Sequence, residues 1–183
     1  IINHTGWRGF GVLPWFAQAN ALPAEDALDI RSGGNGTFHI AVPCLSRIAN
    51  FDDLDPLSQE SEIELIMIRA GQSIPADTDL VLIPGSKSTI GDLHFLRQQG
   101  WDIDLKAHYR RGGYVLGICG GYQMLGKTIS DPDGLEGSTA KIEGLGLLNV
   151  ETIMQSEKTI RRVTAAHLAT CLDIVGYEIH LGN

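Results

Sequence analysis

The sequence has no run of basic residues, no apolar stretch near the roughly 20 residues that a membrane-spanning helix needs, and no C-x-x-C pair. Its formal net charge is −8, which argues against a nucleic-acid partner because proteins that bind phosphate backbones concentrate Lys and Arg. The three cysteines are odd in number and widely spaced, so neither a disulfide framework nor a zinc knuckle is indicated. We therefore expect a cytoplasmic protein that binds no nucleic acid, no membrane and no metal.

The length of the chain, 183 residues of which 43% are hydrophobic, predicts one full domain with part of another. The glycine-rich stretch Ser32–Gly36 is typical of a flexible joint and predicts a domain boundary near Gly33. The first residue is Ile1 rather than Met, and no charged-then-apolar leader follows it. This start indicates a fragment or a processed product, with residues 1–33 separate from residues 34–183.

Short apolar runs alternate with amphipathic segments in the middle of the chain. A continuous apolar run is typical of a strand that is buried on both faces of a parallel sheet. Four such runs are Phe38–Val42, Ile63–Ile68, Leu80–Ile83 and Tyr114–Ile118. Helical spacing is present at Ile90–Arg97 and Ile103–Tyr109, and both helices are expected to stop at glycines. The pattern predicts an α/β fold with a mostly parallel twisted sheet and helices on both faces.

Apolar runs separated by turns also occur near the end of the chain. They are Leu147–Thr152, Ile160–Ala165 and Ile174–Ile179. We expect these runs to form further strands with antiparallel pairing.

One cysteine lies between a predicted strand and a predicted helix. Gly117 stands two residues before Cys119, and Gly120 and Gly121 follow it directly. A strand-to-helix turn of this kind holds a nucleophile in a strained backbone conformation and needs neighbours without side chains. It also places the sulfur at a helix N-terminus, where the dipole favours the thiolate. A free cysteine is more often a small buried apolar residue, but packing alone does not explain three glycines at these offsets, which favours a catalytic nucleophile.

A thiolate nucleophile needs a base from elsewhere in the chain. Of six histidines, His180 is the best candidate because it closes the predicted strand Val175–Ile179, and functional side chains converge at the rim of the sheet in open α/β folds. His94 and His108 fall in helical patterns and are expected at the surface. The remaining three, without supporting context, are His4, His39 and His167. The alternative for each histidine is a structural role with a satisfied hydrogen bond.

A second strand-to-loop junction is Leu80–Thr89. Its Gly-Ser-Lys-Ser sequence is not a phosphate loop, because that motif requires glycines at the positions that Ser86 and Val81 occupy here. The backbone N–H groups near Gly85 and Gly120 are candidates for the donor pair that stabilises an oxyanion. Ser86 is a candidate for substrate binding at the same place, and the alternative for it is a plain helix N-cap.

The run Gly117–Gln123 resembles the G-x-C-x-G-x-Q signature of class I glutamine amidotransferases, whose cysteine takes the amide nitrogen from glutamine. Further segments narrow the resemblance to the CobB/CobQ-like branch, the cobyric acid synthase family. These are Pro84–Leu93, Gly144–Leu148, Tyr177–His180, Ile48–Asp53 and Leu22–Asp26, and together they cover nearly the whole chain. The resemblance implies a flavodoxin-like fold, Cys119 as nucleophile, and a role for Gln123 in holding the substrate glutamine.

The same resemblance implies a division of labour. In that family an N-terminal synthetase domain uses ATP and Mg to activate corrinoid carboxylates, and ammonia from glutamine converts them to amides. Residues 1–33 would be the tail of such a domain plus a linker, and residues 34–183 a glutamine amidotransferase domain truncated at its C-terminus. No cofactor is implied for the second domain. The implied partners are glutamine, the synthetase domain that receives ammonia, and a corrinoid substrate, adenosylcobyrinic acid a,c-diamide.

The sequence departs from most class I members at one position. They carry a glutamate two residues after the histidine, where Gly182 stands here, which matches the branch that works with a Cys-His pair. What orients His180 stays open; Glu178 shares its strand face and is one candidate. Two other functions also stay open: an amidotransferase subunit that acts on a cell-wall lipid intermediate, and a non-catalytic domain that binds a partner.

Overall fold

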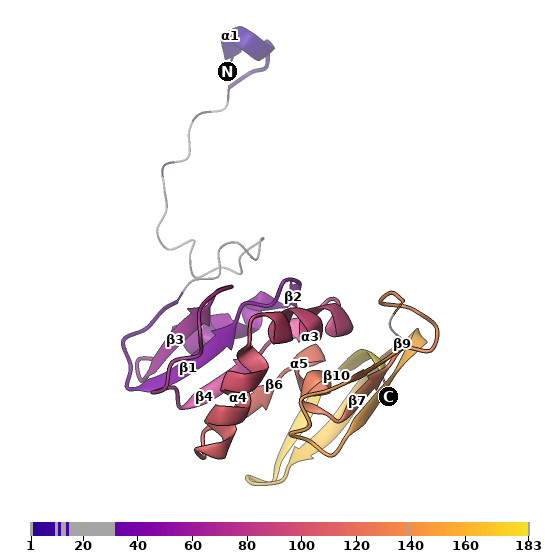
Figure 1. Cartoon of the computed structure of the whole chain (residues 1–183). Helices are drawn as coiled ribbons and strands as arrows, with labels where there is room; N and C mark the ends of the chain where they lie inside the picture. The colour runs from indigo at the N-terminus through magenta and orange to yellow at the C-terminus, as the bar shows by residue number, and fades with distance from the viewer. Residues whose placement is uncertain (1, 10, 12–13, 15–31, 139, 183) are drawn as a thin grey trace.

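A computed structural model describes residues 2–9, 11, 14, 32–138 and 140–182. A four-stranded parallel sheet in the order β3-β1-β4-β6 lies at the centre (Figure 1). Its strands are β1 (Phe38–Pro43), β3 (Ile63–Ile68), β4 (Leu80–Ile83) and β6 (Tyr114–Gly117). The four strands predicted from apolar runs and their parallel arrangement are confirmed, although the last strand ends one residue earlier than expected.

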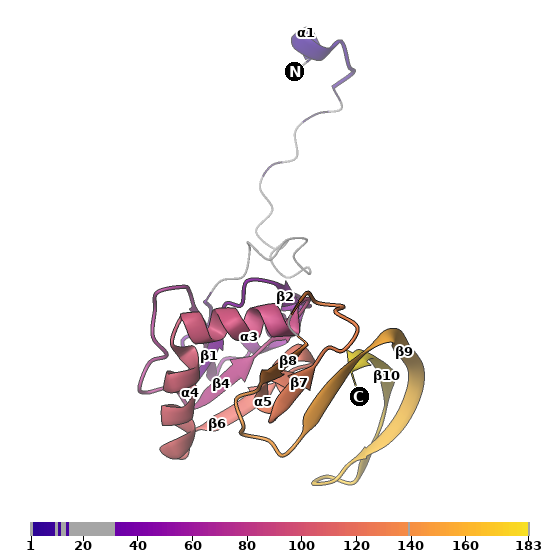
Figure 2. The same ribbon diagram turned by 45° about the vertical axis from the view of Figure 1, so that its right-hand side comes forward.

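Helices cover one face of this sheet, with α3 and α4 lying across it (Figure 2). They are α3 (Thr89–Gln98), α4 (Trp101–Arg110) and α5 (Gly120–Leu125). Leu93, Leu96 and Trp101 belong to the same buried cluster as Val81, and none of these side chains is exposed. Burying one such side chain contributes about 1.5–3 kcal/mol. Gly100 takes a left-handed conformation between α3 and α4 (φ 76°), so the first predicted helix stops at the expected glycine.

The opposite face of the sheet carries a shorter cover, made of the 3-10 helix η3 (Phe51–Leu54) and α2 (Asp55–Ser58). Leu54 is buried there against Val42 and Leu82, which point away from α3 and α4. The prediction of helices on both faces of the sheet is confirmed. The cover is incomplete, however: Leu116 pairs with Leu82 and shares its face, yet 46% of its surface is exposed.

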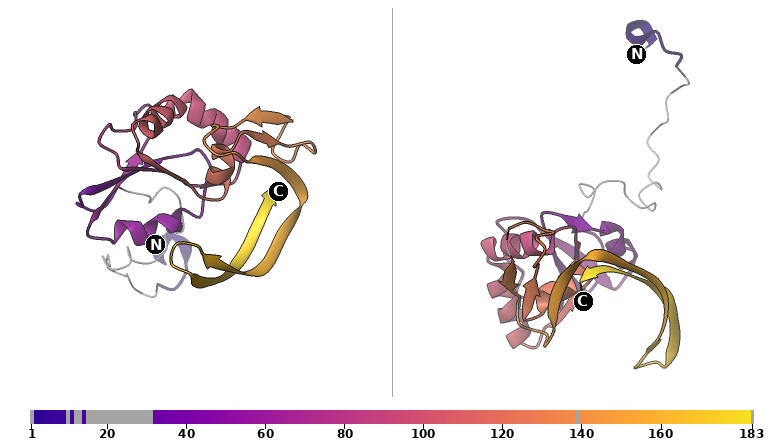
Figure 3. Two further views of the ribbon diagram at one scale, coloured as in Figure 1. Left: turned by 90° about the horizontal axis from the view of Figure 1, so that it is seen from below. Right: turned by 90° about the vertical axis from the view of Figure 1, so that its right-hand side faces the viewer.

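A second sheet in the order β10-β9-β7-β8 follows in the chain. It consists of β7 (Thr128–Ser130), β8 (Lys141–Glu143), β9 (Glu151–His167) and β10 (Leu172–Gly182). The β9–β10 and β7–β8 pairs are antiparallel, while β7 and β9 are parallel. The long β9–β10 ribbon curves away from the central sheet (Figure 3). The strands expected at Ile160–Ala165 and Ile174–Ile179 lie inside this ribbon.

The strand expected at Leu147–Thr152 is wrong in its first four residues, because β9 begins only at Glu151. The residues before it bond to the end of α5 instead. The N–H groups of Leu147 and Leu148 both donate to the carbonyl oxygen of Leu125 at 2.9 Å. Their side chains therefore pack against the core from a loop rather than from a strand.

The glycine-rich stretch Ser32–Gly36, expected to be a flexible joint, runs along the edge of β3. Gly33 and Leu65 exchange two backbone hydrogen bonds of 3.0 and 2.7 Å, and the Ser32 hydroxyl oxygen accepts one from the N–H of Met67. The domain boundary near residue 33 stays a prediction, since residues 15–31 lie outside the described part. The described helix before them is α1 (Ile2–Thr5), and no described helix is long and apolar enough to cross a membrane.

Candidate active site

Cys119 lies at the turn from β6 to α5 and has the backbone of a nucleophile elbow. Its φ and ψ are 49° and −111°, a conformation that side-chain-bearing residues rarely adopt. The flanking glycines are required by contact: a Cβ on Gly117 would lie 2.5 Å from the carbonyl carbon of Gly121, and one on Gly121 would lie 2.2 Å from the carbonyl oxygen of Ile83. The predicted strain and the need for glycine are both confirmed, and the thiol is exposed.

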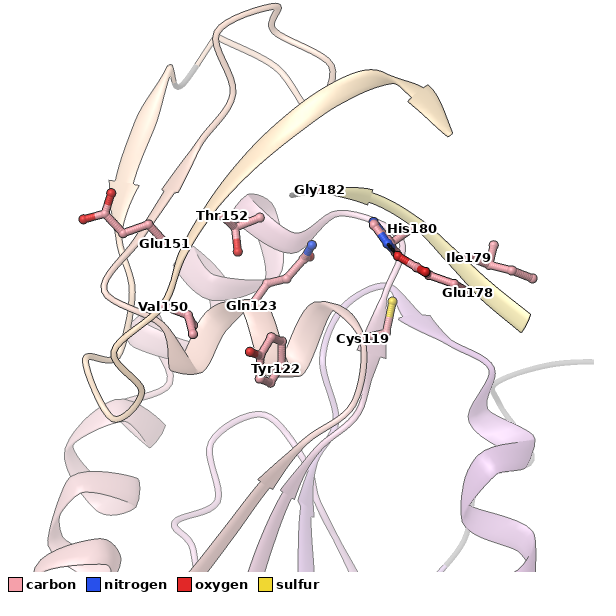
Figure 4. Close-up of a pocket in the computed structure, with 10 residues that line it drawn as sticks. All are labelled: Cys119, Tyr122, Gln123, Val150, Glu151, Thr152, Glu178, Ile179, His180 and Gly182. Carbon is pink, nitrogen blue, oxygen red and sulfur yellow. Dashed lines mark hydrogen bonds and ion pairs between the residues drawn. The ribbon is translucent and has the colours of Figure 1, made fainter. Parts of the chain in front are cut away.

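The strained residue Cys119 leads directly into α5. The carbonyl oxygen of Cys119 accepts a hydrogen bond from the N–H of Gln123 at 3.1 Å, so Cys119 is the N-cap residue of the helix. Its side chain therefore stands at the start of α5. Figure 4 shows the sulfur pointing toward the side chains of Glu178 and His180.

His180 lies in β10, two residues before the strand ends at Gly182. The histidine therefore lies near the end of a strand, as expected, but that strand belongs to the second sheet and not to the parallel sheet that leads to Cys119. Its Nε2 atom bonds the Oε1 atom of Glu178 at 2.6 Å, and its Nδ1 atom is buried without a hydrogen-bond partner. One ring nitrogen is thus held by a carboxylate and the other is left available.

Glu178 also bonds a cation. The guanidinium Nε of Arg161, on the neighbouring strand, donates to Oε2 of Glu178 at 2.6 Å. The hydrogen bonds from Arg161 and then from His180 hold the pKa of the Glu178 carboxyl below its ordinary value, and the same contact raises the pKa of Arg161. Glu178 is therefore a carboxylate at neutral pH.

A pocket of about 490 Å³ unites these residues (Figure 4). Cys119 and Gln123 line it from the side of α5, Glu178 and His180 line it from β10, and Thr152 lines it from the start of β9. The structure therefore brings the predicted nucleophile and the predicted base to one cavity. The contribution of Thr152 was not predicted, because nothing in the local sequence marks the start of β9 as a neighbour of α5.

The two predicted substrate-binding residues differ in their positions. Gln123 lines the pocket, and its Oε1 atom accepts a hydrogen bond of 3.3 Å from the Thr89 hydroxyl. Ser86 is not one of the described residues that line the pocket. Its hydroxyl donates to the buried carboxylate of Asp92 at 2.6 Å and accepts the N–H of Ser88 at 3.0 Å. The Ser86 hydroxyl is therefore occupied in holding the loop before α3.

The predicted oxyanion donors lie on adjacent segments. Gly85 belongs to β5 (Gly85–Ser86), which pairs with β2 (Ile48–Ala49) in a small antiparallel sheet. A Cβ on Gly120 would lie 3.1 Å from the backbone nitrogen of Ser86. The two-residue strands thus hold the Gly85 loop against the start of α5. The oxyanion role of Gly85 and Gly120 stays a prediction.

The other described histidines lie outside this pocket. His108 is buried, which corrects the expected surface position: its Nε2 atom bonds the carbonyl oxygen of Tyr114 at 2.9 Å, and its ring lies against Gly113. His94 is exposed on α3, as expected. His39 bonds the carbonyl oxygen of Asp77, in the segment before β4, and His167 bonds the hydroxyl of Thr170 in the turn that follows it. Of the described histidines, His180 alone lines the pocket with Cys119.

Two similar proteins are both named cobyric acid synthase. The chain is 63% identical over 180 residues to the cobyric acid synthase of Bradyrhizobium diazoefficiens, covering 98% of this chain and 37% of that protein. It is 61% identical over 184 residues to the cobyric acid synthase of Jannaschia sp., covering 100% of this chain and 38% of that protein. The chain therefore spans well under half of the length of these relatives.

Two solved structures share the fold at 16% sequence identity. The structure of PurLQS from Thermotoga maritima aligns with a TM-score of 0.58 over 79% of this chain and 67% of that one. A crystal structure of a glutamine amidotransferase aligns with a TM-score of 0.52 over 78% of this chain and 70% of that one. The arrangement of sheet and helices is thus shared with both of these structures.

The family follows from the sequence. Residues 39–183 match the model of the CobB/CobQ-like glutamine amidotransferase domain. The chain belongs to this family of enzymes.

Proposed function

We propose that this chain hydrolyses glutamine with Cys119 as nucleophile and His180 as base. The single observation that supports this most is the strained cysteine that shares a pocket with a histidine whose Nδ1 atom is buried and unpartnered. A structural cysteine needs neither a left-handed backbone nor a nearby base.

The reaction starts at the thiol. Nδ1 of His180 takes the proton of Cys119, and the thiolate attacks the side-chain amide carbon of glutamine. The backbone N–H groups of Gly85 and Gly120 bind the negative oxygen that forms, which lowers the barrier because the donors are already in place. The imidazolium then gives its proton to the departing nitrogen, and ammonia leaves.

The second half of the reaction regenerates the free enzyme. The remaining thioester between Cys119 and the glutamyl group is attacked by water, with His180 again taking the proton. Glutamate leaves and the thiol is restored, so one glutamine and one water give one glutamate and one ammonia. Gln123 would hold the substrate glutamine, and its place in the lining of the pocket supports this role.

For the whole protein we propose the activity that its relatives' name states, cobyric acid synthesis within cobalamin biosynthesis. Ammonia from this domain would pass to an ATP- and Mg-dependent synthetase region that amidates corrinoid carboxylates, with adenosylcobyrinic acid a,c-diamide as substrate. Identity of 63% over nearly the whole chain supports this choice over the cell-wall lipid amidotransferases. Glutamine hydrolysis itself requires no cofactor. A cytoplasmic location belongs to the same proposal and is supported by three free cysteines.

The test separates the two nitrogen sources in a protein that carries both the synthetase region and this chain. Cys119→Ser should abolish amidation driven by glutamine, because a hydroxyl of much higher pKa is not activated by one histidine in this way. Amidation driven by ammonium at raised pH should persist. Loss of both activities in a folded variant would refute the separation of the two sites, and retention of both would refute the nucleophile.

A further inference from the structure

We infer that Glu178 is the positioning residue that fixes the tautomer and the orientation of His180. This inference rests on the proposed function, because it assigns a partner to the proposed base. It places the orienting carboxylate two residues before the histidine, on the same strand face.

The contact itself is direct. Oε1 of Glu178 lies 2.6 Å from Nε2 of His180, and both side chains are about a quarter exposed, at 27% each. Side chains two residues apart on a strand point to the same face, so β10 itself supplies the alignment. The ribbon does not need to bend to bring the two groups together.

The tautomer follows from the identity of the acceptor. An ionised carboxylate only accepts hydrogen bonds, so the nitrogen that faces it carries the proton. In the neutral ring the proton is then on Nε2, and the lone pair is on Nδ1. Nδ1 is the buried atom without a partner, in the pocket that Cys119 also lines. Glu178 thereby leaves the basic nitrogen free to take the thiol proton and stabilises the imidazolium that results.

A second residue keeps the carboxylate in place. Arg161 on β9 pairs directly with Glu178 on β10 in the register of the ribbon, and it binds the oxygen that His180 does not use. The two oxygens of Glu178 are therefore divided between a fixed cation and the histidine. This division prevents rotation of the carboxylate away from the ring.

Space at position 182 is limited. A Cβ on Gly182 would lie 2.6 Å from the amide nitrogen of Gln123 and 2.7 Å from Cγ2 of Thr152. Any side chain there must displace Gln123, a residue that lines the pocket. Gly182 therefore fits the observed packing of Gln123 and Thr152, and the carboxylate that contacts His180 is that of Glu178.

The experiment compares Glu178→Gln with Glu157→Gln, which makes the same substitution at an exposed position of β9 outside the pocket. Glu178→Gln should lower kcat for glutamine hydrolysis by about 100-fold or more, the lower end of what a positioned acid–base group contributes. KM should change by less than about twofold, because uniform substrate binding is untouched. Glu157→Gln should match the parent in both. Unchanged kcat in a folded Glu178→Gln variant would overturn the inference.

A second measurement does not depend on activity. In the ¹⁵N-labelled parent chain, the long-range ¹⁵N–¹H correlations of His180 should show the proton on Nε2 near neutral pH, and Glu178→Gln should mix the tautomers, because an amide offers both a donor and an acceptor. A proton on Nδ1 in the parent would overturn the inference, even if the variant did not fold. An inactive parent with the proton on Nε2 would instead refute the proposed function and leave the Glu178 assignment intact.

Discussion

Replacement of Gly121 by Ala tests whether close packing holds the elbow in its strained form. The added Cβ would lie 2.2 Å from the carbonyl oxygen of Ile83 and 2.8 Å from that of Pro84. Both atoms are backbone at the end of a central strand, so α5 must move by an estimated ~1 Å to restore ordinary contact. Overpacking costs about 1–3 kcal/mol, and Ala regains up to about 1 kcal/mol through helix propensity. The expected net loss is about 1–2 kcal/mol, or roughly 2–8 °C in Tm for a chain of this size.

The same shift changes the position of the Cys119 sulfur relative to the residues that line the pocket. A misplacement near 1 Å reduces catalysis by about 100-fold, so glutamine turnover should fall much more than stability does. Thermal unfolding and steady-state glutaminase assays measure the two effects. Gly176→Ala in β10 is the matched control, because nothing lies within 4 Å of its Cβ and its φ is not positive; it should lose no Tm. Parental Tm and turnover in Gly121→Ala would refute the packing argument.

Two further perturbations act on the base and its network. His180→Ala should lower glutamine turnover by at least about 100-fold without unfolding the chain; a folded variant of full activity would assign the base elsewhere. Arg161 and His180 hold the pKa of Glu178 in the folded chain below its value in the unfolded chain. The ionised carboxylate therefore stabilises the folded chain at any pH above the unfolded-state pKa of Glu178. This stabilisation is lost as the pH falls through the folded-state pKa of the same group. Acid unfolding should therefore begin at higher pH in Arg161→Met than in the parent, as followed by circular dichroism. An unchanged acid transition would mean that the pair contributes nothing to folding.

The central sheet could be predicted because its strands carry their own signal. Each reads as an apolar run, and β1, β3 and β4 together bury most of their side chains. The glycines around Cys119 mark a turn where packing leaves no room for a side chain. The boundaries of α3 and α4 followed from Gly100 and from Gly112, which both take positive φ. Local sequence therefore determines this half of the molecule and the position of the nucleophile.

The second sheet could not be predicted to the same extent. Most of β9 is exposed, so no buried apolar face marks its 17 residues as one strand. Its pairing with β10 and with β7 joins segments that are distant in the chain, and this pairing brings His180 and Thr152 to the pocket. His108 was misplaced for a related reason: its burial depends on a bond to Tyr114 that no helical pattern reveals.

Covalent labelling by a glutamine-like electrophile tests the identity of the nucleophile most directly. 6-Diazo-5-oxo-norleucine should modify Cys119, which is exposed at a helix N-terminus beside His180. Cys44 should stay unmodified, because burial raises the pKa of its thiol. Cys171 should also stay unmodified, because it lies in the turn between β9 and β10, outside the pocket that Cys119 lines. Peptide mapping by mass spectrometry, with excess glutamine as a protecting control, gives the result. Label on Cys119 that glutamine prevents is the predicted outcome; label on either of the other cysteines with Cys119 untouched would contradict the account.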